Sequence, residues 1–311
     1  MDKVLITGGA GFIGSHLAEE LASQGYQVII LDDLSTGRLE NIRGLVGRDN
    51  VEFIQGSVTD LALLQRLFRG VEYVFHQAAL ASVPGSVEDP LATSEINIGG
   101  TLKVLLAARD NKVKKVIYAS SSSVYGDTSA MPQKEDMPLN PISPYALTKL
   151  TGEHYCHIFR QMYGLATVCL RYFNIYGPRQ SSQYAAVIPA FIQRACQGLP
   201  PVIFGDGAQS RDFVFVKDVV QANILAAESG AEGAYNIGSG RSITIRELAE
   251  SILRVMGKNL TLVYEEPRSG ELKHSLADIT KARGFGYQPR WTLEDGLAET
   301  IAYFSEERNS P

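Results

Sequence analysis

A glycine-rich turn between an expected strand and an expected helix constrains this sequence more than any other feature. The apolar run at residues 4–6 is typical of a buried strand. Beyond the turn, Ile13, Leu17 and Leu21 recur at helical spacing, and Gly25 is placed to end that helix. The chain is therefore expected to begin with a strand, a tight turn and a helix.

Glycines occupy this turn at regular spacing, at Gly8, Gly11 and Gly14. Gly8 would permit the tight turn, Gly11 would let the backbone approach a diphosphate, and Gly14 would let the helix pack closely on the strand. The start of the helix would offer unpaired N–H groups and a positive dipole end to an anion. The turn predicts a dinucleotide site, and a purely structural strand–helix–strand unit is the alternative.

An acidic residue follows the next expected strand, residues 27–31. Asp32 falls where a carboxylate can accept hydrogen bonds from an adenosine ribose. The same carboxylate would repel a 2′-phosphate, so the sequence favours NAD over NADP. The nearby Arg38 weakens this preference because it could pair with such a phosphate.

The composition is that of an ordinary globular protein of 311 residues, with 45% hydrophobic and 20% charged residues. A net charge of −5 argues against nucleic acid or a membrane surface as the main partner. No apolar run is long enough to span a membrane and no signal peptide precedes the first strand, so a cytoplasmic protein is expected. The cysteines and histidines predict neither a disulfide framework nor a metal site, because no set of them has ligand spacing; the cysteines are Cys156, Cys169 and Cys196, and the nearest histidine pair is His154 and His157.

Strands and helices are expected to alternate through the first half of the chain, which predicts a parallel sheet with helices on both faces. The expected strands cover residues 4–6, 27–31, 51–55, 73–75, 115–119 and 166–170, and further helices cover 61–68 and 98–109. After about residue 174 turn-rich segments separate helical patterns at 187–196, 219–227, 244–255 and 293–304. We therefore predict an α/β, doubly wound Rossmann domain over residues 1–174, to which some later segments return. A smaller mixed α/β portion over 175–311 would mainly bind the substrate and pack tightly on it.

Four consecutive serines follow the expected strand at 115–119, namely Ser120, Ser121, Ser122 and Ser123. They would lie at a carboxyl end of the sheet, where this architecture places ligands. A simple exit from strand to loop is the alternative.

The best candidate base is Tyr145, which lies in the segment S-P-Y-A-L-T-K. Ser143 suits an N-cap and Pro144 the first helical position, so Tyr145 and Lys149 would share one helix face. A phenol is a poor base at neutral pH because its pKa is about 10. An adjacent ammonium, a helix N-terminus and an oxidised nicotinamide would each favour the phenolate.

Together these motifs resemble the extended short-chain dehydrogenase/reductase family. The resemblance rests on T-G-G-x-G-F-I-G, S-S-S-x-V-Y-G and Y-x-x-x-K, and it runs from Lys3 to about Phe304. Segments 171–179, 210–213 and 268–271 are similar to the nucleotide-sugar branch of that family. Within the branch the chain most resembles UDP-hexose 4-epimerases, particularly those that accept N-acetylated sugars.

The resemblance implies a reaction and roles for its residues. Tyr145 would take the proton from O4 while C4 gives hydride to NAD, and the 4-keto sugar would turn over before hydride returns to its opposite face. Lys149 would hold the ribose and lower the pKa of the phenol. Ser121 would hydrogen-bond the reacting hydroxyl, with Ser122 or Ser123 assisting. A homodimer built on helices near 95–110 and 145–162 is also implied.

The resemblance further implies two sets of binding residues. Cofactor contacts are expected from Gly8, Gly11, Phe12, Ile13, Gly14, Asp32, Ser57, Val58, Gln77, Ala78, Ala79, Asn97, Ser120, Tyr145, Lys149 and Tyr172. Substrate contacts are expected from Ser82, Ser121, Ser123, Tyr145, Asn174, Val187, Val202, Arg211, Arg268, Glu271 and Ser275. Among these, Asn174 and the two arginines would bind the diphosphate, Glu271 the uridine ribose, and Ser275 would leave room for an N-acetyl group.

Departures from the family pattern bear on the alternatives. Ser57 stands where an Asp usually faces the adenine, and Ala81 where many glucose-type epimerases have Lys. The serines lack the acids that 4,6-dehydratases and UDP-glucuronate decarboxylases carry before V-Y-G. UDP-glucuronate 4-epimerases share this serine stretch but usually have Thr in place of Asn174, and they are the main alternative. A dinucleotide-binding regulator without turnover would typically lose Tyr145 or Lys149.

Overall fold

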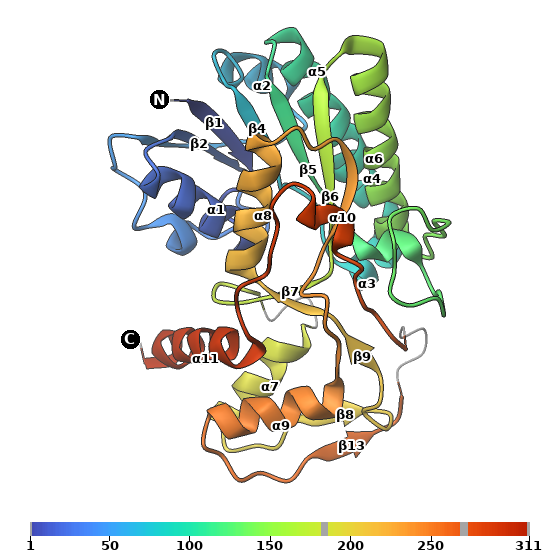
Figure 1. Cartoon of the computed structure of the whole chain (residues 1–311). Helices are drawn as coiled ribbons and strands as arrows, with labels where there is room; N and C mark the ends of the chain where they lie inside the picture. The colour runs from blue at the N-terminus through green and yellow to red at the C-terminus, as the bar shows by residue number, and fades with distance from the viewer. Residues whose placement is uncertain (1, 182–185, 268–272, 310–311) are drawn as a thin grey trace.

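The computed structural model describes residues 2–181, 186–267 and 273–309. Seven of the described strands form one parallel sheet: β1 (Lys3–Thr7), β2 (Gln27–Asp32), β3 (Val51–Gln55), β4 (Tyr73–His76), β5 (Lys115–Ser121), β6 (Ala166–Tyr172) and β11 (Gly233–Ile237). Their order across the sheet is β11-β6-β5-β4-β1-β2-β3. Figure 1 shows this sheet in the upper part of the molecule and a smaller part below it. The predicted doubly wound α/β fold is confirmed.

Helices cover both faces of the sheet, which is why its strands are apolar runs rather than alternating ones. The helices are α1 (Phe12–Ser23) and α8 (Val216–Glu228) on one face, and α2 (Leu61–Leu67), α5 (Thr101–Asp110) and α6 (Pro144–Tyr163) on the other. The apolar side chains of each set form a separate buried cluster with one face of the strands.

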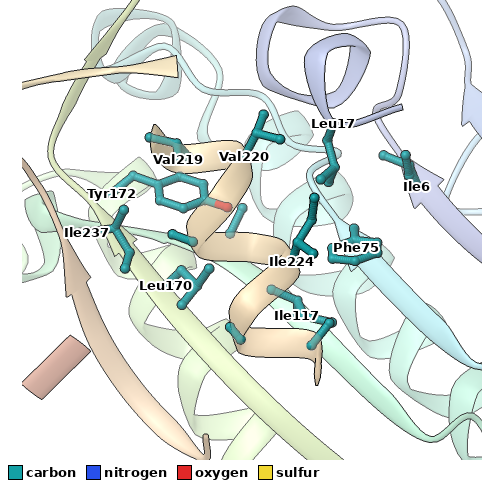
Figure 2. Packing of buried hydrophobic residues seen from close by; sticks show 14 of the residues in the cluster. Ile6, Leu17, Phe75, Ile117, Leu170, Tyr172, Val219, Val220, Ile224 and Ile237 are labelled. Carbon is teal, nitrogen blue, oxygen red and sulfur yellow. The ribbon is translucent and has the colours of Figure 1, made fainter. Parts of the chain in front are cut away.

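Helix α8 comes from the second half of the chain but packs on the sheet formed mainly by the first half. Figure 2 shows its Val220 and Ile224 lying among Leu17 of α1 and the strand residues Ile117 and Leu170. Burying an aliphatic side chain of this size contributes about 1.5–3 kcal/mol. From beyond residue 174, strand β11 joins the seven-stranded sheet and helix α8 packs against one of its faces.

The strand order reverses beside β1. The chain proceeds from β1 outward to β2 and β3, and then crosses to β4, β5 and β6 on the other side. Crossovers in opposite directions leave a crevice at the carboxyl ends of β1 and β4, where open α/β sheets bind ligands. The fold therefore places a site at the edge of the sheet that faces the smaller part (Figure 1).

The smaller part is made of short paired strands and three longer helices. The pairs are β7 (Asn174–Tyr176) with β10 (Phe213–Phe215), β8 (Val202–Phe204) with β13 (Val263–Glu265), and β9 (Ser210–Arg211) with β12 (Ile243–Thr244). The helices are α7 (Val187–Cys196), α9 (Ile245–Val255) and α11 (Leu293–Asn309). A third buried apolar cluster holds them together. The remaining described helices are short: α3 (Val83–Glu88), α4 (Pro90–Ser94) and α10 (Thr280–Arg283).

Two expected elements differ from the structure. The helix expected at 98–109 begins as α5 at Thr101, because residues Glu95–Gly100 form a π-helical turn ahead of it. The helix expected at 219–227 begins earlier, at Val216. β11 and the short strands of the smaller part were not expected. Pairings of two or three residues carry no periodicity. No helix among the described residues has the length and apolarity needed to cross a membrane.

A buried histidine connects β4 to its neighbours. His76 Nδ1 lies 2.7 Å from Thr7 Oγ1, and its Nε2 lies 2.9 Å from Thr101 Oγ1. Burial, helped by the charge of Lys149, lowers the pKa of His76 to about 3. Because the unfolded chain takes up this proton near the ordinary pKa of about 6.5, the folded state loses relative stability as pH falls below that value.

We predict that this histidine makes the protein acid-sensitive. The stability of the wild type relative to His76→Gln should fall by about 1.4 kcal/mol for each pH unit below 6. Urea unfolding at pH 7.5, 6 and 5 measures the difference, with His157→Gln at an exposed histidine as the control. A difference that does not change with pH would contradict the prediction.

Candidate active site

The glycine turn has the tight geometry expected of it. Gly8 has a positive φ of 68°, and a Cβ there would lie 2.7 Å from the backbone nitrogen of Ala78. A Cβ on Gly14 would overlap the carbonyl oxygen of Gly8. Helix α1 therefore packs against the turn at a distance that only glycine permits, and its N-terminus stays open to an anion.

Asp32, at the end of β2, stabilises this turn through hydrogen bonds. Its carboxylate accepts hydrogen bonds from the N–H groups of Ala10 and Leu34, each at 2.9 Å. Burial raises the pKa of Asp32, although these hydrogen bonds oppose the shift. A Cβ on Gly37 would lie 2.6 Å from the carboxylate, so a glycine is needed for the following loop to fold over it.

A cavity of about 660 Å³ runs along the carboxyl ends of the central strands. The residues expected to bind a cofactor that line it are Gly8, Gly11, Phe12, Ile13, Gly14, Asp32, Val58, Gln77, Ala78, Ala79, Ser120, Tyr145 and Tyr172. The cavity is also lined by residues that the sequence analysis did not predict to bind a cofactor, namely Asn41, Ile96, Arg179, Gln193, Tyr303 and Phe304. The glycine cradle and Asp32 at one end, with Tyr145 at the other, fit an extended dinucleotide.

Three expected cofactor residues lie behind the cavity wall. Ser57 bonds Thr59 Oγ1 at 2.9 Å within its own turn. Asn97 accepts a hydrogen bond from the N–H of Leu80 at 2.8 Å and donates to the carbonyl of Leu80 at 3.0 Å. The Asn97 amide thus supports the loop that lines the cavity. The third is Lys149, which lies beneath Tyr145.

Helix α6, which carries Tyr145 and Lys149, begins as the sequence predicts. The Ser143 hydroxyl accepts from the N–H of Ala146 at 3.1 Å, and Pro144 is the first helical residue. Lys149 Nζ lies 5.8 Å from the centre of the Tyr145 ring and donates to the carbonyl of Ala119 at 2.8 Å. Ser143 therefore fixes the start of α6, and Lys149 fixes its first turns on β5.

Side chains also hold the backbone of Tyr145. Its N–H donates to Ser86 Oγ at 3.1 Å, and its carbonyl accepts from Thr148 Oγ1 at 2.7 Å. Thr148 Oγ1 in turn accepts from the Asn97 amide at 3.1 Å. Sequence reasoning missed Ser86, and no spacing signal could have found it, because α3 meets α6 only in the folded chain.

Burial dominates the titration of Tyr145 and Lys149. It raises the pKa of Tyr145, and the hydrogen bond with the Ser121 hydroxyl opposes this shift. Burial lowers the pKa of Lys149 to about 8. That the ammonium, the helix N-terminus and an oxidised nicotinamide favour the phenolate stays a prediction, and in the protein alone the effect of burial on Tyr145 is the larger one.

The four serines have different environments. Ser120 and Ser121 line the cavity, whereas Ser122 and Ser123 begin a 3-10 turn, Ser122–Tyr125, and do not line it. Ser121 Oγ accepts from the N–H of Ser123 at 3.2 Å. The buried Ser123 hydroxyl has no hydrogen-bond partner among the described residues. Of the four serines, only Ser120 and Ser121 could therefore contact a ligand in this cavity.

A second cavity of about 380 Å³ adjoins the first and shares Ile175, Gln180 and Ala186 with it. The expected substrate residues that line it are Asn174, Val187, Val202 and Arg211. Aromatic walls come from Tyr176, Phe191, Phe204 and Phe213. The start of α7, at Val187, brings a helix N-terminus to this cavity.

Two further expected substrate residues, Ser82 and Ser275, do not line either cavity. Ser82 caps α3 by accepting from the N–H of Gly85 at 3.0 Å. Ser275 is buried, and its N–H donates to the carbonyl of Ser210 at 3.0 Å. Arg268 and Glu271 lie outside the described residues. Within the described part of the chain, no cluster of three His, Cys, Asp or Glu side chains could hold a metal ion.

Comparison with known proteins identifies the family. Residues 4–238 match the NAD dependent epimerase/dehydratase family. The chain belongs to this family. This membership confirms the predicted resemblance and NAD as the cofactor.

Three solved structures of this epimerase family are similar over nearly the whole chain. The UDP-N-acetylglucosamine 4-epimerase from Methanobrevibacter ruminantium, in complex with UDP-N-acetylmuramic acid, is 44% identical with a TM-score of 0.96, covering 98% of this chain and 99% of its own. The UDP-glucose 4-epimerase from Thermus thermophilus, in complex with NAD, is 39% identical with a TM-score of 0.89, covering 97% and 99%. The UDP-glucuronic acid 4-epimerase from Bacillus cereus, bound to UDP-glucuronic acid and NAD, is 34% identical with a TM-score of 0.91, covering 98% and 99%.

We predict that the purified epimerase family member carries NAD, which denaturation followed by assay of the released nucleotide will detect. The Gly14→Ala variant should contain less NAD than the wild type, by a factor of about ten or more. The added Cβ would push α1 away from the turn that receives the diphosphate. Gly44→Ala is the control, since a Cβ there meets no atom within 4 Å. Release of NADP, or equal NAD content in both variants, would contradict the prediction.

Proposed function

We propose that this protein is an NAD-dependent UDP-hexose 4-epimerase that interconverts UDP-N-acetylglucosamine with UDP-N-acetylgalactosamine and UDP-glucose with UDP-galactose. The observation that carries the proposal is the pair of adjoining cavities. One holds a dinucleotide cradle with Tyr145 and Ser121 at its far end, and the other offers aromatic walls with Asn174 and Arg211. The names of the similar enzymes support the reaction class.

The chemistry assigns one step to each catalytic side chain. The glycine turn and Asp32 would hold NAD, which would supply a hydride acceptor for C4. Tyr145 takes the proton from O4 and gives it back, and Ser121 shares a hydrogen bond with both the phenol and the reacting hydroxyl. The resemblance assigns the ribose to Lys149, which does not line the cavity and donates to the Ala119 carbonyl at 2.8 Å. The cofactor leaves each cycle in the form in which it entered, so none is consumed.

The second cavity suits the uridine diphosphate. A uracil ring can pack against aromatic side chains, and a guanidinium binds phosphate oxygens in a bidentate manner. Arg211 supplies that charge from β9, and Asn174 lies at the border with the first cavity. We assign Arg268 to the phosphates and Glu271 to the uridine ribose by the sequence resemblance.

UDP-glucuronate 4-epimerisation is the second candidate, and the Bacillus cereus structure supports it. Asn174 in place of Thr favours the hexose reaction. Assays of the purified protein with UDP-glucose, UDP-N-acetylglucosamine and UDP-glucuronate distinguish the candidates. Absence of turnover on all three, with NAD bound, would favour a regulator instead.

We further propose that the enzyme works in the cytoplasm as a homodimer. Helix α6 turns apolar side chains outward at helical spacing, at Leu147, Ile158 and Met162, of which Met162 is 74% exposed. Leu91 of the neighbouring α4 is 82% exposed. A second copy of this chain, placed helix against helix, would bury this stripe, as in the dimer that the resemblance implies.

Tyr145→Phe should lower kcat by about 10²–10⁴-fold, because only the phenolic oxygen that moves the proton is removed. The Kd for UDP-sugar, measured by calorimetry, should stay near that of the wild type. Tyr163→Phe, at the exposed far end of the same helix, is the matched control. A kcat near that of the wild type in Tyr145→Phe would remove Tyr145 from the mechanism.

Ser275→Tyr should abolish turnover of UDP-N-acetylglucosamine and largely spare UDP-glucose. The resemblance assigns sugar choice to Ser275, which lines neither cavity itself. Its side chain is only 6% exposed, so a phenol there would press into its surroundings, and its backbone pairs with Ser210, the neighbour of Arg211. Overlap in a packed site discriminates by more than the ~1–3 kcal/mol of one methylene.

Initial rates with UDP-N-acetylglucosamine and with UDP-glucose measure this substrate preference. Ser275→Ala, which adds no bulk, should keep both activities. Unchanged turnover of the acetylated sugar in Ser275→Tyr would refute the assignment. An equal loss of both activities would show that the substitution disturbs the fold instead.

A further inference from the structure

The catalytic face of α6 continues for one turn beyond Lys149. Tyr145, Lys149 and Glu153 are each four residues apart, so they share one side of the helix. Glu153 is buried, and the Ser120 hydroxyl donates to its Oε1 at 2.5 Å. Ser120 lines the first cavity, next to Ser121. Glu153 therefore reaches the same strand end as the two catalytic residues, yet the mechanism above does not use it.

Arg171 of β6 holds the Glu153 carboxylate in a bidentate contact. Its Nε donates to Oε1 at 2.9 Å and its Nη2 to Oε2 at 2.8 Å. The side chains are only 4% and 8% exposed. A buried ion pair repays its desolvation only with such parallel bonds and further partners. The geometry fixes the carboxylate in one orientation.

The remaining nitrogen of Arg171 extends the contacts toward the substrate side. Its Nη1 donates to Tyr125 Oη at 2.9 Å and to the Glu135 carbonyl at 3.2 Å. The Tyr125 hydroxyl donates to Asn236 Oδ1 at 2.7 Å, and the Asn236 amide donates to the carbonyl of Asp278 at 3.2 Å. The network thus runs from the serine strand end to the segment that carries the proposed sugar-selecting position.

We propose that Glu153 and Arg171 are positioning residues for the hydride-transfer step and that they act through Ser120. This inference rests on the proposed epimerase function. Glu153 and Tyr145 belong to one helix, and Ser120 and Ser121 to one strand end, so the pair sets the distance between Ser121 and Tyr145. A displacement of 1 Å at a reacting centre can cost about 10²-fold in rate.

The test replaces both charges together, as Glu153→Met with Arg171→Met, so that neither charge stays buried alone. The variant should keep its NAD and bind UDP within about twofold of the wild type. The rate at which UDP-sugar reduces the bound NAD, followed by the absorbance of the reduced nicotinamide, should fall at least about tenfold. Arg171→Lys, which keeps the charge but cannot also reach Tyr125, should slow the same step.

A surface ion pair at the far end of α6 is the matched control. Arg160 Nη1 lies 2.7 Å from Glu232 Oε2, and Arg160→Met with Glu232→Met should leave the rate unchanged. Equal rates in the two double variants, or loss of NAD in step with the rate, would overturn the inference. If UDP-sugar does not reduce the bound NAD of the wild type at all, that result would instead contradict the proposed function.

Ser120→Ala tests whether the Glu153–Arg171 ion pair acts through Ser120. It should slow NAD reduction in the wild type and in the Arg160/Glu232 variant, but add nothing to the loss in the Glu153/Arg171 variant. Additive losses would show that the ion pair does not act through Ser120.

Discussion

The packing of α6 on the carboxyl end of β5 is the contact on which the site depends. Lys149 bonds the Ala119 carbonyl at 2.8 Å, and Tyr145 shares a hydrogen bond with Ser121. The two elements are not neighbours by chance, because β5 pairs with β6, the strand that α6 leads into. A right-handed crossover of this kind fixes the side of the sheet on which the helix lies. The fold thus sets the reacting geometry before any ligand enters.

Burial gives this geometry its electrostatic character. Desolvation raises the pKa of Tyr145 and lowers that of Lys149 to about 8, so each group is pushed toward its neutral form. The protein alone therefore keeps the phenol protonated at neutral pH. In the proposed function, proton transfer to Tyr145 would therefore draw on the positive charge of an oxidised nicotinamide.

The sequence could predict the features that depend on residues close together in the chain. The glycine turn, Asp32 and the Tyr145–Lys149 spacing are signals within one or two elements, and the structure brings them together. Ser86 and Arg171 could not be assigned, because they meet α6 only through tertiary contacts. The spacing of Glu153 from Lys149 was readable, since it repeats the helical step of the catalytic pair. The burial of Tyr145, which raises its pKa in the protein alone, could not be predicted, because a sequence shows charges but not burial.

The interleaving of the two halves bears on how, in the proposed function, a sugar would be turned over without release. Asp212, fully buried beside Arg211, accepts hydrogen bonds from Ser239, Gly240 and Ala277, so segments far apart in the chain are fixed around β9. β9 carries Arg211 into the second cavity, which the proposal assigns to the nucleotide end of the substrate. A ligand held at one end can rotate its other end within a shared space. Under the proposal, the second cavity would retain the nucleotide while the sugar rotates in the first.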